Sequence, residues 1–237
     1  MAKPRRNKKP KPAQPPATRH PKTDAKNYVL IELIAQLRDH IDLHRIIGLN
    51  VQELRETKIS SALLGYLQKS AHESLAIYIC KIFESSARNE LNSIPAIIDS
   101  LPATPLSDRQ KQAFEDFGKK YGNHSDATDA KSYLKGTLGL FCGIHSRSLD
   151  RLKEFRDKIG AHSDSNASIK FLPSHAEFEC LFSFANDLYE LISGIITNVG
   201  PATVPRKAGR GFVQLIKAMG VKDAKFDFDD NARETNG

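Results

Sequence analysis

The stretch SHAEFECLFSFANDLYELISGII, residues 174–196, decides the fold class of this 237-residue chain. Ser174 and Glu177 have the spacing of a capping box, in which two side chains bond each other's backbone N–H groups at the start of a helix. Large apolar residues then recur every three or four positions, as they do on the buried face of an amphipathic helix: Phe178, Leu181, Phe182, Ala185, Leu188, Tyr189, Ile192 and Ile196. This stripe predicts a long helix that packs against other helices.

The same helical spacing recurs through most of the chain. Ser107 and Gln110 repeat the capping-box spacing, and neither a strand-like alternation nor an internal repeat of fixed period is found in the sequence. The sequence therefore predicts an all-α protein, an antiparallel bundle of four or more long helices with short accessory helices. The remaining helices are expected at about 27–47, 60–88, 93–101, 107–121, 128–159 and 211–219.

The excess positive charge is confined to the N-terminus. Nine of the 35 basic residues but one of the 28 acidic residues lie in residues 1–26, so the remainder has a net charge of −1. Residues 1–26 are also rich in proline and poor in large apolar residues, which predicts a disordered arm. Such an arm is either a tether that attracts RNA or a partner, or a solubilising extension. We expect a helical domain at 27–200 and an extension with a short helix at 201–237.

Cysteine usage and hydropathy indicate a cytoplasmic protein. Cys80, Cys142 and Cys180 lie far apart with apolar neighbours, as expected of buried free thiols in a reducing compartment. The N-terminus lacks the apolar core of a secretory signal, and no apolar run reaches the length of about 20 residues that a membrane span needs. We therefore expect no interaction with a membrane.

The stretch FRDKIGAHSD, residues 155–164, holds the candidate catalytic groups. Arg156 can hold a phosphate, and the imidazole of His162 can move a proton near neutral pH. On an unbroken helix these two side chains would point about 120° apart, so we expect Gly160 to end the helix and let them converge. The alternative is a helix C-terminus whose cations suit its dipole, with His162 exposed in a loop.

The spacing of Arg156 and His162, with the polar Asp157 directly after the arginine, resembles the motif of the HEPN superfamily, which is an arginine, four to six residues and a histidine. The surrounding sequence resembles the abortive-infection, AbiU-type branch. Three segments carry this resemblance: Leu149–Asp164, Leu75–Glu84 and Asn92–Leu101.

The resemblance implies an endoribonuclease that needs neither a metal nor a cofactor. HEPN domains are helical bundles that commonly form homodimers, with two Arg–His motifs facing one cleft, and active members are often toxins or antiphage effectors. His162 would assist attack by a ribose 2′-hydroxyl or protonate the leaving oxygen, Arg156 would neutralise the phosphate, and Asp157 would orient one of them. The implied partners are RNA, a second copy of the chain, and an antitoxin or defence protein. The alternative is a catalytically inactive HEPN-like module that binds nucleic acid or a protein.

Other candidate sites are weaker. His40 and His44 have a spacing that zinc can use, but no third ligand is identifiable, so exposed helix histidines are expected. His145 lies on the apolar stripe of the predicted helix 128–159, where we expect a packed, hydrogen-bonded side chain or a position that supports the dimer cleft. Asp164 would accept a hydrogen bond from His162 or cap the loop. The glycines form no phosphate-binding loop.

Overall fold

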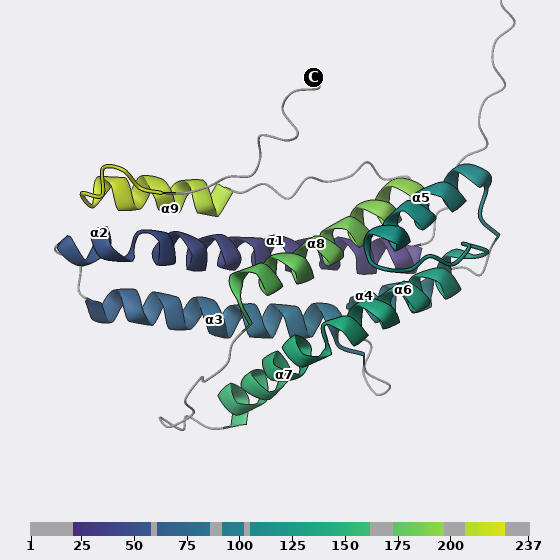
Figure 1. Cartoon of the computed structure of the whole chain (residues 1–237), viewed down its shortest axis with the longest axis horizontal. Helices are drawn as coiled ribbons and strands as arrows, with labels where there is room; N and C mark the ends of the chain where they lie inside the picture. The colour runs from purple at the N-terminus through teal and green to yellow at the C-terminus, as the bar shows by residue number, and fades with distance from the viewer. Residues whose placement is uncertain are drawn as a thin grey trace, which may run out of the picture.

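The computed structural model describes the chain as a set of packed helices (Figure 1). No strand occurs within the described residues, and all but the short connections are helical. The prediction of an all-α bundle is therefore confirmed. The described residues are 21–57, 61–85, 92–101, 105–161, 173–196 and 207–225.

Two long helices, α1 (Pro21–Leu49) and α3 (Ser61–Phe83), lie side by side and antiparallel, joined through the short α2 (Val51–Glu56) (Figure 1). The apolar stripe of α1 is fully buried between its neighbours. α1 begins six residues before the helical pattern predicted from Asn27, at a proline whose missing N–H costs nothing in the first turn of a helix. α3 ends at Phe83, five residues short of the predicted end.

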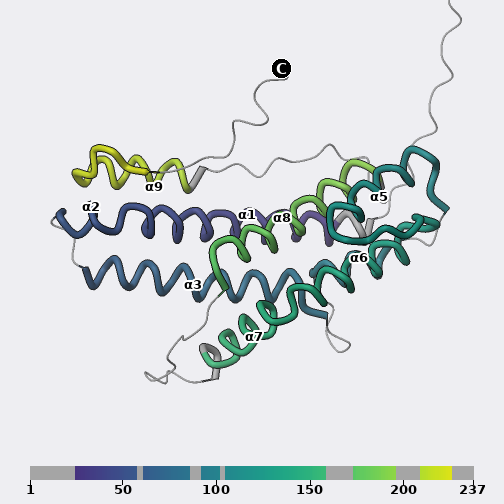
Figure 2. Tube along the Cα trace, in the orientation of Figure 1, coloured from purple at the N-terminus to yellow at the C-terminus, as the bar shows by residue number. Residues whose placement is uncertain are grey.

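The helix predicted at 128–159 is two helices, α6 (Ala130–Ile144) and α7 (Ser146–Ala161). The chain bends at His145, whose backbone ψ of 14° lies outside the helical range, whereas the hydrogen bond from His145 N to Phe141 O continues the α6 pattern. Glycines at positions 136, 139 and 143 lower the helical propensity just before the bend. Figure 2 shows α7 leaving α6 toward the outer side of α3.

The stretch that predicted the fold forms α8 (His175–Leu191), which continues into a π-helical turn, Ile192–Ile196. Its capping box is present: Glu177 N donates to Ser174 Oγ at 3.3 Å, and Ser174 N donates to Glu177 Oε2 at 2.7 Å. The main core gathers around α8, where the ring of Phe184 stacks on Phe141 with 3.9 Å between centroids. Asn27 Nδ2 donates to the hydroxyl of the buried Ser193 at 2.7 Å and so fastens the start of α1 to this turn.

The remaining helices cover the ends of the bundle. α4 (Ile94–Ser100) and α5 (Asp108–Lys120) lie near α6, and α9 (Lys207–Ala218) lies along the far end of α1 (Figure 1). A second small core forms where α9 packs on this end. Its buried residues are Ile46, Leu54, Leu64, Ile216 and Val221. The buried Asn50 closes this end, because its side chain donates to Lys225 O and accepts from Lys225 N. None of the described helices is both long and apolar enough to span a membrane.

Candidate functional site

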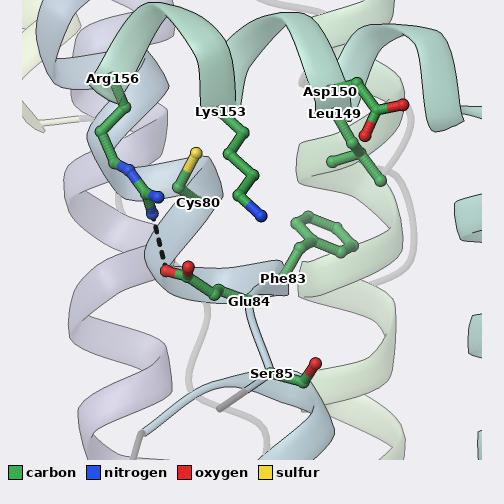
Figure 3. A pocket seen from close by; sticks show the side chains of 8 residues that line it. All are labelled: Cys80, Phe83, Glu84, Ser85, Leu149, Asp150, Lys153 and Arg156. Carbon is green, nitrogen blue, oxygen red and sulfur yellow. Dashed lines mark hydrogen bonds and ion pairs between the residues drawn. The ribbon is translucent and has the colours of Figure 1, made fainter. Parts of the chain in front are cut away.

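Arg156 lies on α7 and points toward the C-terminal end of α3 (Figure 3). Its Nη1 donates to Glu84 Oε2 at 2.7 Å, and this ion pair joins the two helices. The side chain of Arg156 is 25% exposed and that of Glu84 is 39% exposed, so the pair lies at the protein surface, where solvent can reach both groups. The guanidinium is thereby fixed in position but remains accessible to an anionic ligand.

Asp157 also contacts the guanidinium. Its Oδ1 accepts from Arg156 Nε at 3.0 Å and from Arg156 Nη2 at 2.8 Å. An arginine side chain has five N–H donors, and the bonds to Glu84 and Asp157 use three, which leaves two for a ligand. The hydrogen bond to Glu84 is the main reason that the pKa of Arg156 is raised, so its charge is permanent.

Glu84 has a role at this site that the sequence patterns did not predict. It follows directly after α3, and its backbone N–H bonds to Cys80 O, which extends the helical hydrogen bonding by one step. Glu84 is the last residue of the segment Leu75–Glu84, which carries part of the family resemblance. That resemblance was the signal in the sequence that pointed to this residue. Only packing of α3 against α7 shows that its carboxylate meets Arg156, 72 residues later in the chain.

A cavity of about 210 Å³ opens beside Arg156, between α3 and α7. Its lining combines apolar side chains with charged and thiol groups (Figure 3): Cys80, Phe83, Glu84, Ser85, Leu149, Asp150, Lys153 and Arg156. Burial is the main cause that raises the pKa of the Cys80 thiol to about 11, which keeps it protonated at neutral pH. The thiol therefore lines the cavity and does not act as a nucleophile.

The structure corrects the prediction that Gly160 ends the helix. α7 runs through Gly160 to Ala161, and the glycines with positive φ among the described residues are Gly122 and Gly220. Glycine is tolerated in the last turn of a helix, so the residue alone did not mark the helix end. His162 and Asp164 lie outside the described residues, and the convergence of His162 with Arg156 stays a prediction.

His145 is packed and bonded, as the sequence indicated, but at the bend between two helices. Its ring contacts Phe141 with 4.5 Å between centroids, and its Nε2 lies 3.5 Å from Cys180 Sγ. His145 is therefore a partly buried residue at the bend that links the end of α6 to α8.

His40 and His44 are partly buried, which corrects the expectation of exposed helix histidines. The ring of His44 meets His72 of α3 at 4.1 Å between centroids and His175 of α8 at 6.5 Å, because the three helices pack together there. In the described part of the chain, no group of three or more such side chains is arranged to hold a metal ion. The ring contacts of this cluster join α1, α3 and α8.

This cluster predicts a loss of stability in mild acid. Burial, followed by the charges of His72 and His175, lowers the pKa of His44 to about 4 from 6.5. Between these two pH values the unfolded chain binds more protons, so the free energy of unfolding should fall as the pH falls from 6.5 to 4. For His44 we expect a loss of about 1 kcal/mol between pH 7 and pH 5, allowing for solvent screening.

Urea denaturation at pH 7 and pH 5 tests this prediction. His44→Gln should reduce the pH dependence of the free energy of unfolding, whereas His124→Gln, at an exposed position, should leave it unchanged. Equal pH dependence in the wild type and His44→Gln would contradict the assignment of this loss to His44.

Comparison with known proteins identifies the family of the chain. A model of the HEPN class, described as AbiU2, matches residues 27–215, which is most of the chain. The chain belongs to the AbiU2 family of HEPN domains. The resemblance seen in the sequence is thus confirmed at the level of the branch. None of the curated proteins and none of the solved structures matched the chain.

Proposed function

We propose that this AbiU2-family protein is a metal-independent endoribonuclease that acts in the cytoplasm as a toxin or antiphage abortive-infection effector. The observation that carries the proposal is the Arg156 guanidinium, which Glu84 and Asp157 hold at the edge of a cavity with two N–H donors unused. A planar cation held in this way suits a phosphodiester, because paired N–H groups match phosphate oxygens.

The proposed chemistry is an internal transesterification. The ribose 2′-oxygen attacks the adjacent phosphorus, the new P–O2′ bond forms and the P–O5′ bond breaks. The products are a 2′,3′-cyclic phosphate and a free 5′-hydroxyl. His162 takes the 2′-hydroxyl proton or gives a proton to the leaving 5′-oxygen, while Arg156 stabilises the charge that develops on the phosphate. The need for a 2′-hydroxyl selects RNA over DNA.

The proposed active species is a homodimer in which two Arg156–His162 motifs face one cleft, with an antitoxin or defence protein as a further partner. Attraction of RNA needs more charge than the described site supplies. Around Arg156, the two basic groups Arg156 and Lys153 lie among three acidic ones, Glu84, Asp150 and Asp157. The basic residues within 1–26 can supply the missing attraction.

The same charge balance favours one alternative, an inactive HEPN module that binds a protein partner. In that case Glu84 and Asp157 would remain the permanent partners of Arg156, and no phosphate would bind the guanidinium. The two functions differ in whether purified protein cuts RNA.

Cleavage by purified protein should survive EDTA and should disappear in His162→Ala. Metal chelation has no effect on a reaction whose proton transfers use side chains, and loss of a general acid–base group typically costs about 100- to 10,000-fold in rate. The measurement is the cleavage rate of a labelled single-stranded RNA, with product ends identified by mass spectrometry. His124→Ala, at an exposed loop position, is the matched control and should cut normally.

Absence of RNA cleavage by the wild type, with full binding to a protein partner, would favour the inactive module. Cleavage that EDTA abolishes would contradict the proposed mechanism and leave a nuclease of a different kind.

A further inference from the structure

Lys153 is a second cation in the cavity of Arg156. It lies on α7 one turn before Arg156, and it is one of the residues that line the cavity. Figure 3 shows its side chain pointing from α7 into the cavity that Arg156 also lines. Residues three apart on a helix have Cβ atoms about 5–6 Å apart, so the two cations share one face of α7.

The bonding of Lys153 differs from that of its neighbours. Lys158 on the same helix pairs with Glu154, and Arg156 pairs with Glu84 and Asp157. Among the residues that the structure describes, no ion pair is formed by Lys153, although Asp150 lies three positions earlier on the same helix. Its side chain is exposed, so it does not fill the core either.

An exposed lysine that forms no ion pair with the described residues contributes little to the stability of that part of the fold. The position on the cavity wall gives it a different use, because an ammonium group offers three donors to an anion. Arg156 has two N–H donors left, enough for one phosphate, whereas an RNA strand carries a phosphate at every nucleotide. A neighbouring phosphate needs a further cation, and Lys153 lines the same cavity as Arg156.

We propose that Lys153 binds the RNA phosphate next to the one that Arg156 holds. This inference rests on the proposed function and deepens it, because it defines the substrate as a strand with at least two consecutive phosphates. Lys153 is a positioning residue in this scheme: it fixes the register of the strand and takes no part in bond making. A single phosphodiester would occupy Arg156 and leave Lys153 without a ligand.

Binding is tested separately from cleavage, with an oligonucleotide of 2′-O-methyl RNA, whose 2′-oxygen cannot attack. Fluorescence anisotropy would give the dissociation constant of the full-length protein from about 50 to 200 mM salt, a range over which phosphate contacts weaken strongly. Lys153→Gln should weaken binding several-fold at the lowest salt and reduce the salt slope by about 0.7, the value for one phosphate contact on a single strand. Lys153→Arg should restore most of the affinity.

Lys119→Gln is the matched control, because Lys119 is an exposed lysine on α5 that likewise forms no ion pair with the described residues. It should bind as the wild type does. Equal affinity and equal salt slope in Lys153→Gln and the wild type would overturn the inference and would leave the proposed nuclease function intact.

Cleavage of short substrates is the second measurement. Lys153→Gln should lower kcat/KM for a trinucleotide with two phosphates and leave it unchanged for a dinucleoside monophosphate. An equal loss on both substrates would overturn the assignment to the neighbouring phosphate. A reduced salt slope in Lys153→Gln, combined with no cleavage by the wild type, would support the phosphate contact and contradict the nuclease.

Discussion

Replacing Arg156 with alanine should reduce RNA cleavage by about 100- to 1,000-fold, the usual cost of removing one donor that stabilises transition-state charge. Arg156→Lys should be nearly as damaging. The guanidinium bonds Glu84 through one edge and Asp157 through another, and a lysine cannot reproduce this planar arrangement. Arg109→Ala, at an exposed position on α5, is the control and should retain full activity.

The loss should be one of activity and not of folding. Arg156 is an accessible residue, and its partners Glu84 and Asp157 are 39% and 58% exposed, so they remain hydrated when the arginine is removed. Exposed ion pairs of this kind contribute about 1 kcal/mol or less. Urea denaturation should therefore show a stability close to that of the wild type. A large loss of stability in Arg156→Ala would mean that the pair holds α3 and α7 together.

Mixing the two inactive variants tests the composite site. If each catalytic site takes Arg156 from one protomer and His162 from its partner, a heterodimer of Arg156→Ala with His162→Ala contains one complete site. Activity should then return after the variants are mixed and allowed to exchange subunits. Failure to recover activity, with exchange shown by light scattering or mass spectrometry, would place both groups of a site in the same chain.

The fold was predictable where one pattern governed one helix. The stretch Ser174–Ile196 combined a capping box with an apolar stripe, and both appear in α8. The bend at His145 was not predictable in this way, because the apolar stripe continues across it and the backbone hydrogen bonds scarcely change. At the bend His145 contacts Phe141 and Cys180, and Cys180 lies 35 residues later in the chain, on α8.

The site was predictable only in part, for a similar reason. Arg156 and Asp157 belong to a local motif, and they are neighbours in the sequence, so their contact could be expected. Glu84 becomes part of the site through the packing of α3 on α7, which no local pattern encodes. Lys153 lies three positions before Arg156 on the same helix and lines the same cavity. The sequence also predicted an exposed His44, because residue spacing along α1 does not show that α3 and α8 cover that side of the helix.

Replacing Arg38 with methionine should destabilise the protein by about 3–5 kcal/mol, the cost of breaking a buried ion pair from one side. Arg38 is 5% exposed, its Nη1 donates to Glu179 Oε1 at 2.9 Å, and Asp42 Oδ1 lies 3.6 Å away. Its guanidinium also lies over the ring of Phe182, 3.7 Å from the centroid. Methionine keeps part of the packing and removes the charge that both carboxylates face. Urea denaturation at pH 7 measures the loss, with Arg109→Met as the exposed control.

The pH dependence of this loss identifies its cause. Burial raises the pKa of Glu179, but bonds to His175 and Arg38 outweigh it and bring the pKa down to about 2. Without Arg38, burial has a larger share in setting the pKa of Glu179, so this pKa rises. Glu179 of the folded variant therefore binds a proton at a higher pH than Glu179 of the wild type does. The difference in unfolding free energy between the wild type and Arg38→Met should therefore shrink as the pH falls from 7 to 4. Adding Glu179→Met to Arg38→Met should recover stability at pH 7, because it removes a partly buried charge that has lost its contact with Arg38. A double variant less stable than Arg38→Met would show that the cost arises from packing around Phe182 and not from the carboxylate of Glu179.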